Sequence, residues 1–117
     1  MAERRVSLKL EVSISDSEIE SIIEDAGYVQ HSWNLGGVID TDKRTFTCSY
    51  DDGEEVCETS CTFDDIIEAI EKVAETRMTV ISDLTYKFVE GVMAGDMDAE
   101  DYDCIVQTAL FGSVLYG

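Results

Sequence analysis

The acidic run that begins at Asp96 has the spacing of part of a calcium-binding loop. Asp96, Asp98 and Glu100 occupy the first, third and fifth positions of a possible EF-hand loop, where oxygen ligands would bind Ca²⁺. The sixth position is Asp101, where the loop needs glycine, and the twelfth is Gln107, where it needs glutamate. The pattern therefore predicts weak binding of divalent cations by the acidic run, and we expect no dedicated metal site.

Four cysteines allow three kinds of thiol chemistry. Cys57 and Cys61 fall on one face of a predicted strand, Cys48 on the strand before it and Cys104 in a later helix, so four thiolates could bind zinc. Their spacing differs from that of a zinc ribbon. A Cys48–Cys57 disulfide is geometrically possible but would not persist in a reducing cytoplasm. Buried free thiols that pack as small hydrophobic side chains are the favoured interpretation.

Catalytic residues in a recognisable arrangement are not found in the sequence. His31, the one histidine, lies beside Trp33 in a β-prone stretch, which is typical of a packed or rim residue rather than of a general base. Gly36-Gly37 lies between two strand-like stretches and so does not form a phosphate-binding loop, and no serine lies in a nucleophile elbow. We therefore expect a binding protein that is not an enzyme and has no cofactor.

Net charge is the strongest signal in the composition. Eight Lys and Arg stand against 26 Asp and Glu, a formal net charge of −18, whereas a magnitude of about 2 to 8 keeps a small domain in solution. Such charge attracts basic surfaces, and it disfavours direct nucleic-acid binding, which calls for a basic patch. Adaptation to a salt-rich cytoplasm would produce the same excess. The composition therefore favours a partner with a basic surface, such as one that binds nucleic acid.

Acidic side chains gather in a predicted helix after Thr62, at a predicted hairpin tip and at the start of the last predicted helix. In the first of these, carboxylates three or four residues apart line one face, and each four-residue step advances about 6 Å. We interpret these groups as a surface that imitates a nucleic-acid backbone. The alternative is a solvated acidic face, which helix N-termini favour. The predicted partner-binding residues are Asp64, Asp65, Glu68, Glu71, Glu75, Asp51, Asp52, Glu54, Glu55, Asp96, Asp98, Glu100 and Asp101.

In the first half of the chain, the sequence pattern predicts one helix with strands before and after it. Apolar and polar residues alternate over 5–14, which predicts a strand, and a capping box at Ser15 opens a helix over 16–26. A β-prone stretch at 28–34 and a short strand at 38–42 follow. A hairpin then pairs 45–50 with 54–61 through a two-residue turn at Asp52-Gly53, which would place Cys48 opposite Cys57.

The second half of the chain predicts three helices. Apolar spacing predicts them over 62–77, 82–94 and 98–110, with Gly95 and Gly112 ending the last two. In the second, Leu84, Phe88, Val89 and Val92 recur at helical spacing and are expected to form its buried face. The segregated order predicts an α+β fold, an antiparallel sheet of three to four strands with helices packed on one face, in a single domain over 1–117. No stretch is long and apolar enough for a membrane span, and no signal peptide is expected.

The two ends of the chain resemble a group of small acidic, uncharacterised proteins of tailed bacteriophages. The likeness lies in residues 12–23 and in the tail IVQTALFGSVLYG over 105–117, where the group has aliphatic-Gln-x-Ala-Leu-Phe-Gly-x-aliphatic-x-Tyr-Gly. No functional residue carries over with this likeness. The resemblance implies a phage protein in a bacterial cytoplasm, where small acidic phage proteins counter host defence by mimicking DNA or blocking nucleases and CRISPR effectors.

Two functional hypotheses follow from these observations. The first is an acidic phage-type inhibitor, of the anti-CRISPR or DNA-mimic kind, that binds a host nucleic-acid-handling or defence protein through its negative surface. The alternative is a non-enzymatic structural or regulatory phage protein, a homodimer in one version, whose acidity serves solubility only. The apolar tail is expected to cap the core or to lie along a sheet edge, and an exposed Tyr116 would favour a docking patch or dimer seam instead.

Overall fold

A computed structural model describes residues 10–116, and it contains a three-stranded antiparallel sheet in the order β1-β2-β3. The strands are β1 (Asn34–Asp40), β2 (Thr45–Asp51) and β3 (Val56–Thr62). Phe46, Cys48 and Cys61 are buried side chains of this sheet. The predicted α+β class with an antiparallel sheet is confirmed.

Three helices begin and end close to their predicted bounds. They are α1 (Asp16–Ala26), α2 (Phe63–Ala74) and α4 (Ala99–Phe111). Each begins with a capping box, in which the side chain of the residue before the helix and an acidic side chain three residues later bind each other's backbone N–H groups. The capping pairs are Ser15 with Glu18, Thr62 with Asp65, and Asp98 with Asp101. Local sequence was sufficient to predict these helices because both the capping residues and the apolar spacing are local.

Helix α3 spans Met78–Glu90, whereas the sequence predicted a helix over 82–94. It ends at Gly91, which has a φ of 82° in the left-handed region that favours glycine, and not at Gly95. Of its side chains only Val80 and Asp83 are buried. Phe88 and Val89, expected on the buried face, are exposed, so the predicted orientation of this helix is wrong.

The inner face of α3 carries charged residues, and this explains the error. Asp83 is buried because its carboxylate accepts hydrogen bonds from the backbone N–H groups of Asp96 and Met97, at 2.8 and 2.9 Å. Lys87 lies one turn further along and binds Glu18 of α1. These partners are distant in sequence, so the apolar side chains alone gave the wrong face.

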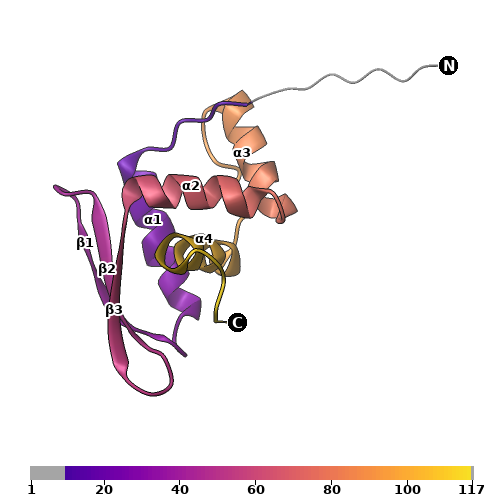
Figure 1. The fold of residues 1–117 in the computed structure, drawn as a ribbon. Helices are drawn as coiled ribbons and strands as arrows, with labels where there is room; N and C mark the ends of the chain where they lie inside the picture. The colour runs from indigo at the N-terminus through magenta and orange to yellow at the C-terminus, as the bar shows by residue number, and fades with distance from the viewer. Residues whose placement is uncertain (1–9, 117) are drawn as a thin grey trace.

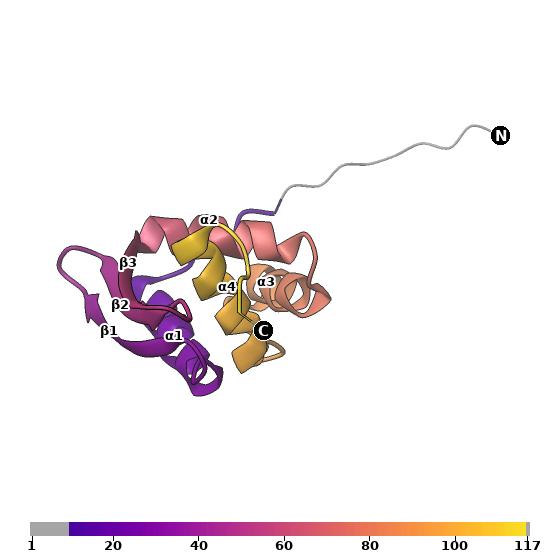
Figure 2. The same ribbon diagram turned by 60° about the horizontal axis from the view of Figure 1, so that its bottom comes forward.

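Figures 1 and 2 show the sheet at one side of the molecule and α3 farthest from it. Helices α2 and α4 contact β3, α1 packs against α4, and α3 packs against α2. The main core includes Ile19, Ile22 and Ile23 of α1, together with apolar side chains of α2 and α4. Helix α2 therefore packs against β3, α4 and α3, and its acidic face is exposed to solvent.

The alternating segment predicted as a strand over 5–14 is not a strand in its described part. Residues 10–14 lie outside the sheet, and residues 5–9 lie outside the described part of the chain. Leu10, Val12 and Ile14 line a groove that side chains of α2 and α3 complete. Alternation places every second side chain on one side of an extended chain. Here that side faces a pair of helices instead of completing a half-buried strand.

The stretch from 28 to 34 was predicted to be β-prone, but most of it forms turns. A short 3-10 helix, η1, covers Gly27–Val29, and the backbone N–H groups of Trp33 and Asn34 then both donate to the carbonyl of Gln30, at 3.3 and 2.9 Å. Strand β1 begins only at Asn34 and ends at Asp40, earlier than the predicted strand over 38–42. These turns place Trp33 in the core, where 1% of its surface is exposed.

The hairpin of β2 and β3 is confirmed, but its predicted register is wrong. Asp51 pairs with Val56, so the loop covers residues 52–55 instead of the two residues expected. The carboxylate of Asp52 accepts hydrogen bonds from the N–H groups of Glu54 and Glu55, each at 2.9 Å, and these bonds stabilise the wider loop.

This register changes the neighbours of the sheet cysteines. Cys48 is opposite Thr59, and Cys57 is opposite Tyr50. All four cysteines are free thiols. The predicted pairing of Cys48 with Cys57 is therefore wrong, and with it the geometric basis for a disulfide between them.

The C-terminal tail packs on the core. Tyr116 stacks on Trp33 with ring centroids 5.4 Å apart, and Phe111 meets Trp33 edge-on at 5.7 Å. The buried side chain of Gln107 accepts hydrogen bonds from the N–H groups of Leu115 and Tyr116 and donates one to the carbonyl of Tyr116. Phe111 and Tyr116 therefore cap the core, as the sequence favoured, and Tyr116 is only partly exposed, whereas Val114 and Leu115 of the same tail are exposed.

Candidate acidic interaction surface

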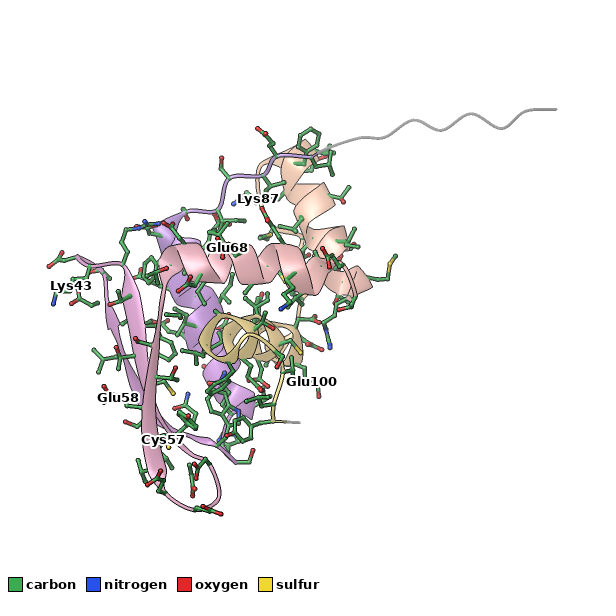
Figure 3. All side chains as sticks on the ribbon, in the orientation of Figure 1. Lys43, Cys57, Glu58, Glu68, Lys87 and Glu100 are labelled. Carbon is green, nitrogen blue, oxygen red and sulfur yellow. The ribbon has the colours of Figure 1, made fainter. Side chains whose placement is uncertain are left out.

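Helix α2 presents the most regular row of carboxylates. Asp64, Glu68, Glu71 and Glu75 are all exposed, while Ile66, Ile70 and Val73 on the opposite face are buried. The row follows from the amphipathic sequence, because burying the apolar face turns the acidic face outward. Figure 3 shows Glu68 on this helix. The row spans about 16 Å along the helix axis.

Asp65 belongs to the same helix but has a structural role. Its carboxylate accepts a hydrogen bond from the backbone N–H of Thr62 at 2.8 Å, and it is only partly exposed. Part of its charge is therefore used at the helix start. The row available to a partner consists of Asp64, Glu68 and Glu71 of α2 and the C-cap residue Glu75, and we call it the α2 acidic row.

The hairpin tip carries a second acidic group, made of Asp51, Asp52, Glu54 and Glu55, all exposed. Figure 1 shows the β2–β3 loop at the opposite end of the sheet from α2, because β3 runs from the loop to the start of that helix. The hairpin group and the α2 acidic row thus lie apart, and the structure does not bring them together into one patch.

The third group, at the start of α4, serves mainly to hold the helix and its preceding loop. Asp98 caps α4, and Asp96 accepts a hydrogen bond from the hydroxyl of Ser82 at 3.0 Å. Asp96, Asp98 and Glu100 remain exposed. The spacing that suggested a calcium-binding loop in the sequence is therefore also the spacing of acidic residues at a capped helix N-terminus.

Asp101 was predicted to lie on the partner-binding surface, and this is wrong, since only 1% of its surface is exposed. Its carboxylate accepts hydrogen bonds from Arg77 at 2.6 Å and from the hydroxyl of Thr79 at 2.9 Å. Burial raises the pKa of Asp101, but hydrogen bonds from the Asp98 backbone, Arg77 and Thr79 outweigh it, so the pKa is lowered overall. Asp101 is a structural anion that joins α4 to the start of α3.

The cations of the described chain are largely engaged. Arg44 binds Asp16 at 3.0 Å and Asp64 at 3.4 Å, and Arg77 binds Asp101. Lys72 donates to the backbone carbonyl of Gly112 at 2.7 Å. In residues 10–116 the salt bridges reach Asp64 and Asp101 but none of the other predicted partner-binding residues. Glu68, Glu71 and Glu75 are therefore exposed to solvent without a salt-bridge partner among the described residues.

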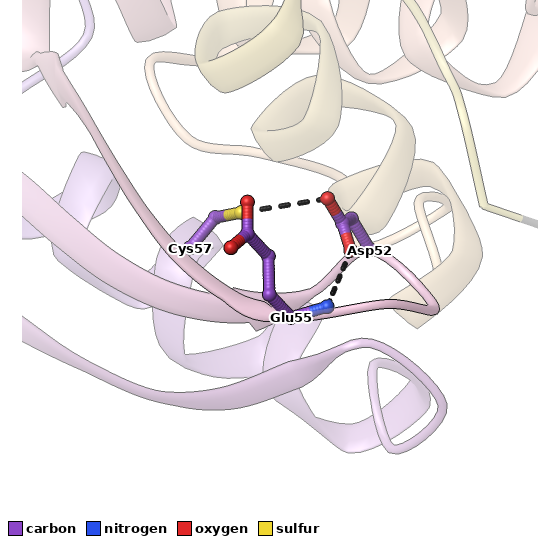
Figure 4. Close-up of side chains that lie close together, drawn as sticks. All are labelled: Asp52, Glu55 and Cys57. Carbon is purple, nitrogen blue, oxygen red and sulfur yellow. Dashed lines mark hydrogen bonds between the residues drawn. The ribbon is translucent and has the colours of Figure 1, made fainter.

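A close group of Asp52, Glu55 and Cys57 was not predicted from the sequence (Figure 4). Their ligand atoms lie within 4.8 Å of one another, and in the described residues they are the one such group with metal-ligand chemistry. The Cys57 thiol donates to Asp52 at 3.5 Å. Burial, Asp52 and Glu55 raise the pKa of Cys57. The thiol is therefore protonated at neutral pH, which does not favour a thiolate metal ligand.

The other cysteines do not assemble the four-thiolate zinc site considered from the sequence, because the described residues contain no such cluster. Burial raises the pKa of Cys48 to about 11 and that of Cys61 to about 12. Both are buried, as expected for inert thiols, whereas Cys57 and Cys104 are partly exposed.

Comparison of the chain with protein families, with curated proteins and with solved structures gave no match. Within residues 10–116, no helix has both the length and the apolar character needed to cross a membrane.

Proposed function

We propose that this chain is an acidic phage-type inhibitor that binds a host protein which handles nucleic acid or takes part in defence, of the anti-CRISPR or DNA-mimic kind. It acts by binding, without catalysis and without a cofactor, in the cytoplasm of the bacterial host. The contact is made by the α2 acidic row against a basic nucleic-acid-binding surface of the host protein.

The observation that carries this proposal is the exposed α2 acidic row, in which three of the four carboxylates have no salt-bridge partner among the described residues. Glu68, Glu71 and Glu75 have no salt-bridge partner among the described residues, although like charges three or four residues apart destabilise a helix. The row places a charge about every 5 Å, compared with about 3.4 Å per phosphate along one DNA strand. Such a line of charge attracts a surface built to bind a phosphate backbone.

The test is an affinity pull-down from bacterial lysate at low and high salt, followed by mass spectrometry and direct binding measurements with the retained protein. We expect a DNA- or RNA-processing protein at low salt, with affinity falling steeply as salt rises. The triple variant Glu68→Lys, Glu71→Lys, Glu75→Lys should weaken that complex at least about 100-fold, because it replaces attraction with repulsion at the contact.

The matched control is Glu11→Lys, Glu24→Lys, Glu58→Lys, which changes net charge equally at exposed positions elsewhere. Figure 3 shows Glu58 on the side of the sheet away from the helices. Equal losses in both triple variants would mean that total charge matters and the α2 acidic row does not.

A homodimeric regulatory protein is the second candidate, and the exposed apolar side chains of α3 are the observation in its favour. Sedimentation velocity separates the two candidates. A dimer that persists at high salt, together with retention of nothing but the protein itself in the pull-down, would favour the second.

A further inference from the structure

Helix α3 exposes a large part of its apolar surface. Met78, Tyr86, Phe88 and Val89 are exposed by 77, 46, 52 and 71%. Exposed apolar residues scattered singly need no explanation, but these share one helix of 13 residues. Burying them inside this chain would require a further layer beyond α3, where the described part of the molecule ends (Figure 2).

Several of these side chains form a groove along α3, with a volume of about 520 Å³. Met78, Ile81, Thr85, Tyr86 and Val89 line it, and we call it the α3 groove. These side chains recur every three or four residues, so the α3 groove runs about 16 Å along the helix axis. A second helix packs against side chains with this spacing. A helix surface offers no free backbone groups, so an extended strand would gain no ladder hydrogen bonds there.

The charges around the α3 groove are negative. Glu90 and Asp96 belong to its lining and are exposed. The cations nearest in sequence are engaged elsewhere, since Arg77 binds Asp101 and Lys87 binds Glu18. A second copy of this chain would bring the same carboxylates and a charge of −18 to the contact, so like charges would oppose each other.

We propose that the α3 groove binds an amphipathic helix of the partner protein, with apolar side chains on one face and Lys or Arg on its flanks. The apolar side chains pack on Met78 and Val89, and the flanking cations face Glu90 and Asp96. This inference deepens the proposed function and rests on it, because it names the segment that a basic partner presents. The α3 groove supplies short-range packing, which the α2 acidic row does not.

The test uses a fluorescein-labelled synthetic helix of 18 residues with leucines at helical spacing on one face and lysines on its flanks, in fluorescence anisotropy at physiological salt. We expect saturable binding. The variants Met78→Ser and Val89→Ser should each weaken it about fivefold, and the double variant at least about tenfold, because each removes apolar contact area.

The matched control is the double variant Val38→Ser, Val56→Ser, since these valines of the sheet are 69 and 66% exposed and also leave net charge unchanged. Its affinity should stay within about twofold of the unmodified chain. A second peptide with serine in place of leucine keeps the same charge and should bind at least about tenfold more weakly.

Several outcomes would overturn the inference. One is the absence of binding. The others are equal binding of both peptides and equal affinities of the two double variants, since either would mean that Coulomb attraction accounts for the binding without apolar packing. A dimer that Val89→Ser dissociates would assign the groove to a second copy. An affinity gain of tenfold or more on removal of residues 1–9 would assign it to the chain's own N-terminal residues. The peptide experiment uses no host protein, so it is independent of the pull-down. The pull-down can fail to support the proposed function while the peptide binds, and the peptide can fail to bind while the pull-down supports the proposed function.

Discussion

At the scale of single residues, the carboxylates of this chain include two contrasting kinds. Asp83 and Asp101 are buried and hold backbone or side-chain donors, whereas Glu68, Glu71 and Glu75 are exposed and bind nothing in the described chain. Their residue types are alike, so composition does not separate them. The second kind is available to a partner, and the first kind is not.

The variant Asp101→Ala should lower the free energy of unfolding by about 2 to 3 kcal/mol at pH 7, because Arg77 and Thr79 lose a buried acceptor. The pKa of Asp101 is lowered in the folded state, so its contribution is complete above the unfolded-state value of about 3.9 and is lost as pH falls through the folded-state value. Urea unfolding from pH 7 to pH 3 measures both effects.

The matched control for that experiment is Glu100→Ala, the neighbouring exposed acid, whose loss should cost less than about 1 kcal/mol. The stability difference between Asp101→Ala and the unmodified chain should shrink below about pH 4. A difference that is constant down to pH 3 would show that the carboxylate charge is not what stabilises this site.

At the scale of elements, α2 and α3 have the same length within one residue and very different burial. Helix α2 buries Phe63, Ile66, Ala69, Ile70 and Val73, whereas α3 buries only Val80 and Asp83. The burial of apolar area is the main source of helix stability in a folded domain. The α2 acidic row and the α3 groove therefore lie on helices of unequal stability.

Backbone amides of α3 should exchange with deuterium at least about tenfold faster than those of α2, because local opening costs less where fewer apolar contacts are broken. Hydrogen–deuterium exchange followed by mass spectrometry, with peptides covering 63–74 and 78–90, measures this. Equal protection of the two helices would contradict the prediction and would indicate that the Lys87–Glu18 and Asp83 contacts stabilise α3 as well as apolar packing does.

Local patterns were sufficient for α1, α2 and α4, since capping boxes and apolar spacing are written within each segment. They were insufficient where a side chain has a distant partner. The buried face of α3 depends on Asp83 meeting the loop at Asp96, and the burial of Asp101 depends on Arg77. The hairpin register depends on the Asp52 carboxylate, which favours a wider loop than the Asp-Gly pair predicts. The acidic row of α2 was predictable because it is the complement of an apolar face.

At the scale of the whole molecule, a net charge of −18 on 117 residues acts against the compact state. Raising NaCl from 20 to 300 mM should raise Tm by about 5 °C, because screening weakens the repulsion more than it weakens a few surface ion pairs. Differential scanning calorimetry measures the change.

The variant Glu68→Gln, Glu71→Gln, Glu75→Gln is a useful companion in that experiment. It should have a higher Tm at low salt and a smaller salt increment, since it removes neighbouring like charges from one helix face. A Tm that falls as salt rises would show instead that ion pairs such as Arg44–Asp16 outweigh the repulsion.

The packing of the tail has a consequence for comparing this chain with others in evolution. Gln107, Phe111 and Tyr116 are occupied with closing the core over Trp33. Selection for folding alone is enough to preserve such residues, while the outward residues of α2 and α3 are free to drift toward new partners. Two descendants of one ancestor can thus keep the same C-terminal tail and recognise different targets. Similarity in the tail would therefore indicate common ancestry and a common fold, and would not indicate a common binding partner.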